Sequence, residues 1–263
     1  MAKRSTYVHG TSRKEQARLA KLNEITNASY LDFLSLRGHE KVLEVGSGLG
    51  ILTSAVSREL KTGCVVGVEY SEDQLAKAPP AGRRLRFVRG DAHHLPFEDN
   101  SFDVVYSRYV LEHVADPVRV LKEMRRVLKR GGSVFTLENN IAMNLFYPEC
   151  PVYVKLWKDL GTLQSALGGD AYIGIRLFAL LNEAGFRKVV PGIFPEVHYY
   201  GSPSFNLWVD NTLDILRGAE EGFIEHGLAQ EGEVDAAEIE LKEFKKNKNA
   251  STIFYWNRVK GIK

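Results

Sequence analysis

Cysteine is scarce in this chain, and the residue patterns of disulfide-bonded and metal-binding proteins are absent. Only two cysteines, Cys64 and Cys150, occur among the 263 residues. Two cysteines are too few for a disulfide framework, and these two lack the spacing of metal ligands. We therefore predict a protein of a reducing compartment, the cytoplasm, without a bound metal.

Long apolar runs and an excess of one charge are also missing. No stretch reaches membrane-spanning length, and the amino terminus does not resemble a signal peptide. The 35 Lys and Arg residues nearly balance the 33 Asp and Glu residues, which leaves a formal net charge of +2. Such a balance gives no electrostatic reason to expect a polyanionic partner. Neither a membrane nor a nucleic acid is the expected partner.

A glycine-rich turn follows a short apolar strand near the start of the chain. The segment KVLEVGSGLG places glycines at positions 46, 48 and 50. We expect such a turn, where a strand meets a helix, to leave backbone N–H groups uncovered for the polar tail of a ligand. A second strand, VVGVEYS, ends on Glu69 about twenty residues later. An acidic side chain there can accept hydrogen bonds from a ribose, so a ribose-bearing cofactor is predicted.

The spacing of the glycines favours one class of cofactor. A dinucleotide-binding turn needs its third glycine where this chain has Ile51, and no Gly-Lys-Ser/Thr follows as in a P-loop. The G-x-G-x-G spacing, preceded by Glu44, resembles motif I of the class I S-adenosylmethionine-dependent methyltransferases. An NAD-dependent dehydrogenase is correspondingly disfavoured.

Later blocks resemble the same family in the same order. LRFVRGDAHHLPF places Asp91 and Ala92 just past a strand end, where motif II puts an acidic side chain and a backbone N–H at the adenine. FDVVYSRYVLEHV resembles the strand and helix beside the methionine moiety, and RVLKRGGSVFTLEN resembles the fifth strand. Four ordered blocks over residues 41–139 are a far more specific signal than one motif.

The resemblance implies a set of residues that hold S-adenosylmethionine. Glu69 would bind the ribose, and Tyr70 would pack on the adenine, with a core tyrosine as the alternative. Arg108 and its neighbour Ser107 end the fourth strand, where a backbone carbonyl faces the methionine amino group in this family. Glu44 is suited to orient that amino group, or to hold the glycine turn as a structural acid. The predicted cofactor-binding residues are Glu44, Gly46, Ser47, Gly48, Glu69, Tyr70, Asp91, Ala92, Ser107 and Arg108.

Two residues are candidates for proton transfer. His113, in VLEHV, follows the fourth strand on a predicted helix, and an imidazole can take an acceptor's proton near neutral pH. In phosphoethanolamine methyltransferases, which share the look of YSR followed by a histidine, that histidine pairs with an amino-terminal tyrosine. Tyr7 is the counterpart here. The alternative is a histidine that only packs or caps.

The alternation of strands and helices predicts an α/β fold. Between residues 41 and 139 it implies βαβ units and a parallel sheet. The family implies a Rossmann-like, mostly parallel sheet of seven strands, with STIFYWNRVKGIK as a last, antiparallel strand at the sheet edge. We divide the chain into an amino-terminal helical lid (1–40), a cofactor-binding core (41–139), and a helical, aromatic cap with the final strands (140–263).

The predicted function is methyl transfer from S-adenosylmethionine to a small-molecule acceptor, as in ubiquinone and menaquinone biosynthesis methyltransferases, which this chain resembles. Two alternatives stay open. One is a methyltransferase of RNA or protein, although SRYV stands where amino-methylating nucleic-acid enzymes have Asn/Asp-Pro-Pro-Tyr/Phe. The other is a non-catalytic S-adenosylmethionine-binding module that regulates a partner. The sequence specifies neither the atom that is methylated (O, N, C or S) nor the oligomeric state.

Overall fold

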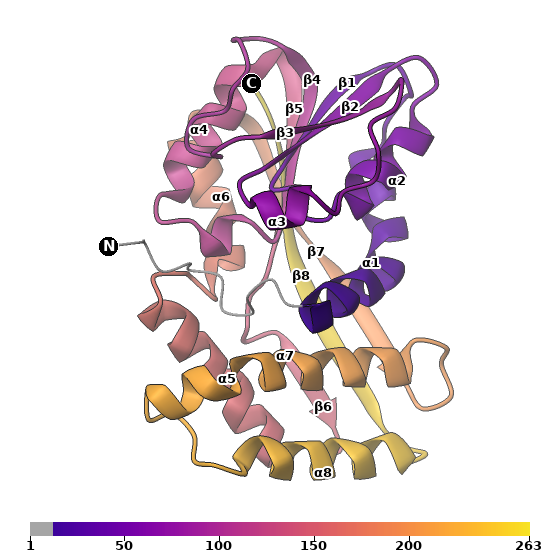
Figure 1. The fold of residues 1–263 in the computed structure, drawn as a ribbon, viewed down its shortest axis with the longest axis vertical. Coiled ribbons are helices and arrows are strands. Elements are labelled where there is room, and N and C mark those ends of the chain that lie inside the picture. The colour runs from indigo at the N-terminus through magenta and orange to yellow at the C-terminus, as the bar shows by residue number, and fades with distance from the viewer. Residues whose placement is uncertain (1–12) are drawn as a thin grey trace.

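A computed structural model describes residues 13–263, except for the side chains of residues 13–17, 19–21, 24 and 25. Within this part, eight strands form one sheet in the order β3-β2-β1-β4-β5-β8-β6, with β7 also paired to β8 (Figure 1). The strands are β1 (Lys41–Val45), β2 (Cys64–Glu69), β3 (Leu85–Arg89), β4 (Phe102–Arg108), β5 (Leu128–Glu138), β6 (Asn144–Tyr147), β7 (Arg187–Tyr199) and β8 (Ser251–Ile262).

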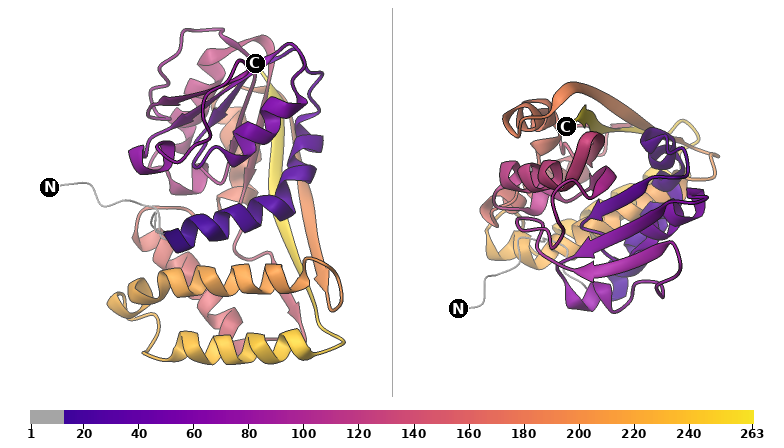
Figure 2. Two further views of the ribbon diagram at one scale, coloured as in Figure 1. Left: turned by 45° about the vertical axis from the view of Figure 1, so that its right-hand side comes forward. Right: turned by 90° about the horizontal axis from the view of Figure 1, so that it is seen from above.

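Helices cover the sheet and extend beyond one end of it. In the described part they are α1 (Arg13–Leu34), α2 (Ile51–Glu59), α3 (Glu72–Leu75), α4 (Pro117–Val127), α5 (Pro151–Ala166), α6 (Ile173–Glu183), α7 (Phe205–Glu225) and α8 (Glu233–Lys246), with a 3₁₀ turn η1 (Leu111–His113). Figure 2 shows α1 and α2 on one side of the central strands and α4 and α6 on the other.

Both faces of the parallel strands are buried. Val42 and Leu43, adjacent in β1, are each fully buried, because successive side chains point to opposite faces. Val42 belongs to the hydrophobic cluster that includes residues of α1 and α2, whereas Leu43 belongs to the cluster with α4 and α6. This two-sided burial explains the near-continuous apolar runs seen in the sequence.

The parallel arrangement brings the predicted motifs together. β1 pairs in parallel with β2 and β4, β2 with β3, and β4 with β5. The carboxyl ends of these strands therefore lie at one edge of the sheet, where open α/β sheets bind ligands. The predicted α/β class, mostly parallel with an antiparallel last strand, is confirmed.

The position of the last strand differs from the prediction, and so does the strand count. β8 is not an edge strand. Its carboxyl-terminal half pairs with β5, its amino-terminal half pairs with β6, and β7 runs along its other side. The physical reason is the register, because only residues 257–262 of β8 pair with β5, so residues 251–254 extend past the end of β5 and pair with the unpredicted β6. The described sheet therefore has eight strands where seven were expected.

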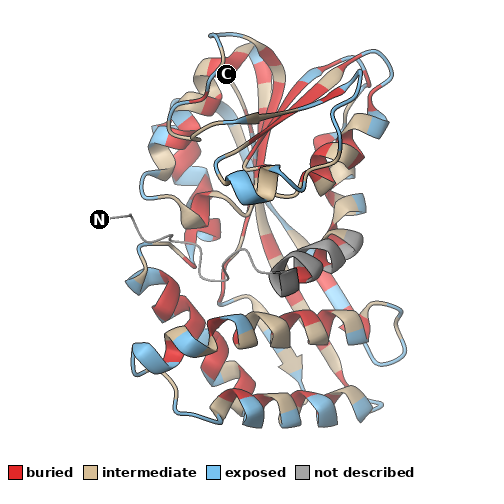
Figure 3. Ribbon diagram, viewed as in Figure 1, coloured by how far each residue is buried: buried red, intermediate tan, exposed pale blue. Residues whose placement is uncertain are grey.

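Beyond the end of β5, the β7–β8 pair continues into a cap built with α5, α7 and α8 (Figure 1). Figure 3 shows buried positions on the inner sides of these helices and exposed positions on their outer sides. The buried interior is rich in aromatic side chains, among them Tyr153, Trp208, Phe223 and Phe254, each at most 2% exposed. The aromatic cap expected from residues 140–263 thus encloses part of its aromatic residues, whereas others, such as Tyr147 and Tyr199, are exposed.

Candidate functional site

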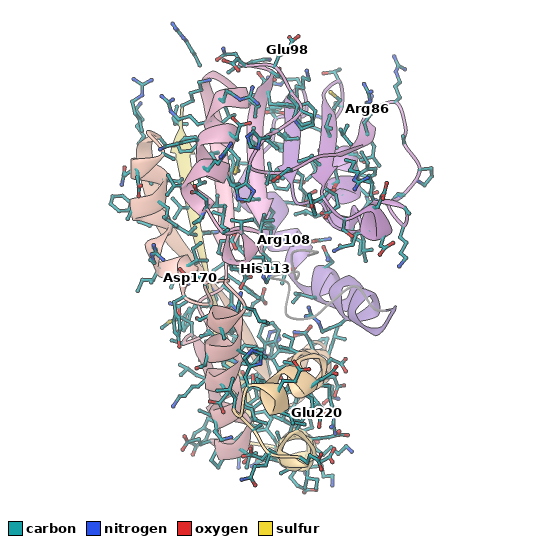
Figure 4. All side chains as sticks on the ribbon, turned by 60° about the vertical axis from the view of Figure 1, so that its left-hand side comes forward. Arg86, Glu98, Arg108, His113, Asp170 and Glu220 are labelled. Atoms are coloured by element: carbon teal, nitrogen blue, oxygen red, sulfur yellow. The ribbon has the colours of Figure 1, made fainter. Side chains whose placement is uncertain are left out.

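A cavity of about 770 Å³ lies at the carboxyl ends of the parallel strands, between the sheet, α1 and the cap. Ten of the residues predicted from the sequence line it: Glu44, Gly46, Ser47, Gly48, Glu69, Tyr70, Asp91, Ala92, Arg108 and His113. Ser107 does not line it, and Tyr7 lies outside the described residues. Arg108 and His113 both line this cavity, and Figure 4 shows them at the level between the sheet and the cap.

The glycine turn is shaped by steric demands rather than by free donors. Gly46, Gly48 and Gly50 have φ values of +74°, +54° and +71°, which favour glycine. A Cβ on Gly46 would lie 2.4 Å from Cγ2 of Val110. These glycines let the main chain turn tightly at the cavity wall.

The expectation of uncovered N–H groups in this turn is wrong. The amides of Gly46 and Ser47 donate to the Val68 carbonyl at 2.8 and 3.0 Å, and the Gly48 amide donates to Glu69 Oε2 at 2.9 Å. The end of the neighbouring strand captures these donors because β2 runs parallel beside β1. The turn therefore offers a ligand close approach and the side chains beside it, not a row of free amides.

Glu69 is held rigidly at the tip of β2. Its Oε2 accepts from Gly48, and its Oε1 accepts from the Ser71 amide at 2.8 Å. Each carboxylate oxygen has two lone pairs, so both retain capacity to accept from a diol. The arrangement joins the second strand to the glycine turn and fixes the acid at the cavity.

Glu44 is a buried acid with an unusual protonation equilibrium. It is 4% exposed, and its Oε2 accepts hydrogen bonds from the hydroxyls of Thr53 and Tyr106. Burial raises the pKa of Glu44 to about 7, against the opposing effects of Thr53, the Arg108 charge and Tyr106. A cationic group in the cavity would favour the ionised form.

The adenine-side candidates differ in their surroundings. Tyr70 is 72% exposed, which excludes the alternative of a core tyrosine. Asp91 follows β3 and accepts from the backbone amide and the ring of His93, each at 2.8 Å. Burial alone would raise the pKa of Asp91, but these hydrogen bonds lower it below its usual value. Asp91 is thus ionised and oriented beside Ala92 at the cavity.

Ser107 and Arg108 connect β4 to α1. The Ser107 carbonyl accepts from the Tyr30 hydroxyl at 2.9 Å, so this carbonyl already has a donor from α1. The Arg108 guanidinium donates to Thr26 Oγ1 at 3.2 Å and to Asn23 Oδ1, and lies 5.4 Å from the Tyr30 ring centroid. Arg108 lines the cavity with a positive charge and fixes α1 against the sheet.

His113 lies on a 3₁₀ turn, not on the predicted helix. The carboxylate of Glu138, at the end of β5, accepts from the backbone amides of Val110 at 3.2 Å, Leu111 at 3.0 Å and Glu112 at 3.4 Å. These bonds anchor η1, and α4 starts only at Pro117. The His113 side chain is 16% exposed and its Nε2 lies 3.8 Å from Glu112 Oε1.

Glu138 and Glu112 were not predicted, although they shape the site. Burial, reinforced by the nearby Glu112 charge, raises the pKa of Glu138 to about 8. Glu112 is 6% exposed, and its Oε2 accepts from Gln164 Nε2 at 3.1 Å. A sequence signal for Glu138 existed, because it ends a strand at the same sheet edge as Glu69.

The cap supplies the far wall of the cavity. The described residues there that the sequence did not single out are Arg18, Leu22, Asn23, Tyr109, Asn139, Trp157, Leu160, Gln164, Ile215 and Trp256. Tyr109 and Trp256 touch with ring centroids 4.7 Å apart. These residues come from α1, α5, α7, β8 and the segments that follow β4 and β5, and only the tertiary fold assembles them.

The described residues show neither a cluster of metal ligands nor a membrane-spanning helix. Among the described residues, no three His, Cys, Asp or Glu side chains come together as a metal site, so His93 and His94 lack further ligands. None of the described helices is both long and apolar enough to span a membrane.

Comparisons with known proteins agree with this geometry. Residues 43–136 match the model of a methyltransferase domain. The demethylmenaquinone methyltransferase of Staphylococcus aureus is 40% identical over 128 residues, which are 47% of this chain and 51% of the relative. The chain thus spans about half the length of the curated relatives that it matches.

Solved structures share the fold at low sequence identity. The YcgJ protein of Bacillus subtilis has a TM-score of 0.58 and 18% identity, covering 90% of this chain and 97% of that one. A phosphoethanolamine N-methyltransferase 2 of Haemonchus contortus, in complex with phosphomonomethylethanolamine and S-adenosylhomocysteine, has a TM-score of 0.56 and 19% identity, covering 94% and 53%.

Proposed function

We propose that this chain, which belongs to the class I S-adenosylmethionine-dependent methyltransferases, transfers a methyl group to a small-molecule acceptor. One observation carries the proposal. Ten residues chosen from the sequence for this cofactor and reaction line a single cavity, and the far wall of that cavity is formed by the cap. The relative from Staphylococcus aureus, by its name, methylates a menaquinone precursor, which supports an acceptor of small-molecule size.

The residues of the cavity fit the cofactor S-adenosylmethionine. Glu69 binds the ribose hydroxyls and Asp91 marks the adenine end, with Tyr70 exposed for stacking on the base. Gly46, where a Cβ would clash with Val110, keeps the turn tight at the cavity wall where the methionine moiety would lie. When bound, this cofactor supplies an activated methyl group on a sulfonium, so the protein needs chiefly to align the two reactants.

At the methionine end, Glu44 and Arg108 carry opposite charges on the same stretch of the cavity. Glu44 accepts from the amino group of the cofactor, and its buried carboxyl is stabilised in the ionised form by that cation. Arg108, fixed by Asn23 and Thr26, faces the cofactor carboxylate. The carbonyl of Ser107, predicted to meet the amino group, already accepts from the Tyr30 hydroxyl and retains a second lone pair, but Ser107 does not line the cavity.

His113 takes the proton that the acceptor loses. Its imidazole lines the cavity, and η1 is held in place by Glu138. Glu112 at 3.8 Å stabilises the imidazolium that forms. Tyr7, the predicted partner of His113, lies outside the described residues and remains part of the proposal.

Cysteine chemistry supports a proposal for the cellular compartment. Cys64 and Cys150 are both free thiols in the structure. Unpaired cysteines support a reducing environment, and we propose the cytoplasm.

The proposed function is tested by transfer of radiolabelled methyl groups from S-adenosylmethionine into a fractionated cell extract. We expect label in the small-molecule fraction, resistant to nuclease and protease. Label that is lost on nuclease or protease treatment would instead indicate RNA or protein as the acceptor. Cofactor binding without any transfer, together with a stable complex with another protein, would indicate a regulatory module.

A further inference from the structure

A group of buried polar atoms without hydrogen-bond partners lies inside the cap. Among the described residues, these atoms are Asn144 Oδ1, His198 Nε2, Trp208 Nε1 and Thr252 Oγ1. Beside them, Glu196 and Trp256 interact with each other, and Glu196 Oε2 lies 3.8 Å from His198 Nε2. Buried polar atoms are nearly always paired in folded proteins, so a concentration of unpaired ones requires an explanation. Five of these side chains are strongly buried: Thr252 is 1% exposed, His198 and Trp208 are 2% exposed, and Glu196 and Trp256 are 7% exposed.

Strand register places these side chains on one face of the cap sheet. His198 of β7 lies directly opposite Thr252 of β8, and Glu196 lies opposite Phe254, as Asn144 of β6 does from the other side. Since side chains alternate along a strand, Glu196, His198, Thr252 and Trp256 point to the same side. That side faces α7, where Trp208 stacks on His198 with centroids 4.6 Å apart.

The group adjoins the functional cavity. Trp256 both belongs to it and lines the cavity, and Tyr109 touches Trp256 from the cavity side. Glu196 lies behind this pair: burial raises the pKa of Glu196 to about 7, and a hydrogen-bonding interaction with the Trp256 indole opposes that rise. Glu196, His198, Trp208 and Thr252 do not themselves line the cavity, so Trp256 separates them from it.

The chemistry of the group specifies what it can bind. Two indole N–H groups and the Thr252 hydroxyl are donors, and Glu196 and Asn144 offer acceptor oxygens, whereas His198 can do either. Burial lowers the pKa of His198 to about 4, and with the raised pKa of Glu196 both side chains favour their neutral forms. A neutral ligand that both donates and accepts hydrogen bonds matches this set, and the neighbouring aromatic rings suit an apolar body.

We propose that Glu196, His198 and the two indoles bind the distal end of the methyl acceptor, and that this end is a neutral, hydroxyl-bearing group on an apolar body. The inference rests on the proposed methyl transfer, and it adds the class of acceptor. Trp256 is the boundary between the two parts of the site, so its ring must turn to admit the acceptor. Ordered water at the same atoms is the rival occupant.

The first experiment separates recognition from structure. Replacing buried unpaired polar groups by apolar ones of similar shape is neutral or stabilising. We therefore expect Glu196→Met and His198→Phe to keep or raise the melting temperature and to keep S-adenosylhomocysteine affinity. Their apparent KM for the small-molecule fraction of a cell extract, assayed by labelled methyl transfer, should rise tenfold or more. Glu225→Met and His226→Phe, at exposed positions of α7 and its end, are the matched controls.

An unchanged apparent KM in both cap variants would overturn the inference and assign the group to structure or bound water. Should Glu196→Met fail to fold, Glu196→Gln with the same readout takes its place, with a KM increase expected. Absence of any transfer by the unaltered protein would instead overturn the proposed function, so the two failures are distinguishable.

A second experiment needs no turnover. Benzyl alcohol, benzylamine and benzoate are titrated into protein saturated with S-adenosylhomocysteine, and binding is followed by tryptophan fluorescence. We expect benzyl alcohol to bind at least tenfold more tightly than the two charged compounds, and His198→Phe to remove the preference. Equal binding of all three, or tighter binding of a charged one, would overturn the inference.

Discussion

The most informative single residue is Glu69, whose carboxylate joins two strands and faces the cavity. We expect Glu69→Ala to weaken S-adenosylmethionine binding tenfold or more, because two charge-assisted hydrogen bonds to a ribose are each worth about 1.5–3 kcal/mol. Isothermal titration calorimetry measures the change. Glu72→Ala is the control, since Glu72 is exposed and pairs only with Arg89. Unaltered affinity in Glu69→Ala would remove Glu69 from the cofactor site.

A second residue, His113, has two possible roles, proton transfer and packing, and its replacement separates them. If His113 accepts the proton, His113→Ala should lower kcat about a hundredfold or more while cofactor affinity stays the same. Steady-state kinetics on the identified acceptor, with binding measured separately, gives both values. Full turnover by His113→Ala would leave this histidine a packing role.

Among the elements, the turn after β1 depends on glycine for two separable reasons. Gly46→Ala adds a strained positive φ and a clash with Val110. Gly131→Ala adds the same kind of strain at φ +78°, but no atom lies within 4 Å of the new Cβ. We expect Gly131→Ala to cost about 1–2 kcal/mol of unfolding free energy, and Gly46→Ala to cost more and also to weaken cofactor binding. Urea denaturation and calorimetry test this pair, and equal losses would show that the clash is relieved.

The 3₁₀ turn η1 is a second element whose geometry depends on one side chain. Glu138→Gln keeps the shape but replaces one accepting oxygen by an NH₂ group that cannot accept. We expect faster hydrogen exchange at the amides of residues 110–112 and a lower kcat with little change in cofactor affinity. Glu40→Gln is a close control, because Glu40 also accepts from three consecutive amides, those of Arg37, Gly38 and His39, but this segment does not line the cavity. Unchanged exchange and kcat in Glu138→Gln would contradict a positioning role.

The elements also show how far the sequence could lead. The acids at the strand ends could be predicted, because Glu69 and Asp91 come at the ends of apolar segments and parallel strands have their carboxyl ends at one edge of the sheet. The same logic would have found Glu138. The hydrogen bonds made by the amides of the glycine turn could not be predicted from the sequence, since their acceptors, Val68 and Glu69, lie on another strand. Trp256 could not be placed either, because its position depends on where β8 passes from β5 to β6.

For the whole molecule, three buried carboxyls set a pH dependence of stability. The pKa values of Glu44 and Glu196 are raised to about 7 and that of Glu138 to about 8, all mainly by burial. A raised carboxyl pKa means that the folded state holds protons which the unfolded state has already lost, so stability falls as pH rises from the unfolded toward the folded pKa. Between pH 6.5 and 8 we expect the melting temperature to fall by several degrees.

Differential scanning calorimetry across this pH interval tests the expectation. His198 opposes the trend only below its ordinary pKa near 6.5, because its own pKa is lowered to about 4. Glu196→Gln should flatten the decline, and exposed Glu225→Gln should not. A melting temperature that is constant or rises from pH 6.5 to 8 would contradict the assignment of these carboxyls as neutral in the folded protein.

The strand β8 has a consequence for the exchange of parts between related proteins. Its two halves belong to different structures, since one completes the central sheet beside β5 and the other forms the backbone of the cap. If the cap were exchanged between two proteins at loop boundaries, two outcomes are possible. Either the donor's β8 would replace a strand of the recipient's central sheet, or the cap would lose β8, the strand between β6 and β7. Chimeras should keep their fold only when the junction lies within β8, near Trp256. The donor's acceptor preference would then be transferred together with the amino-terminal half of β8.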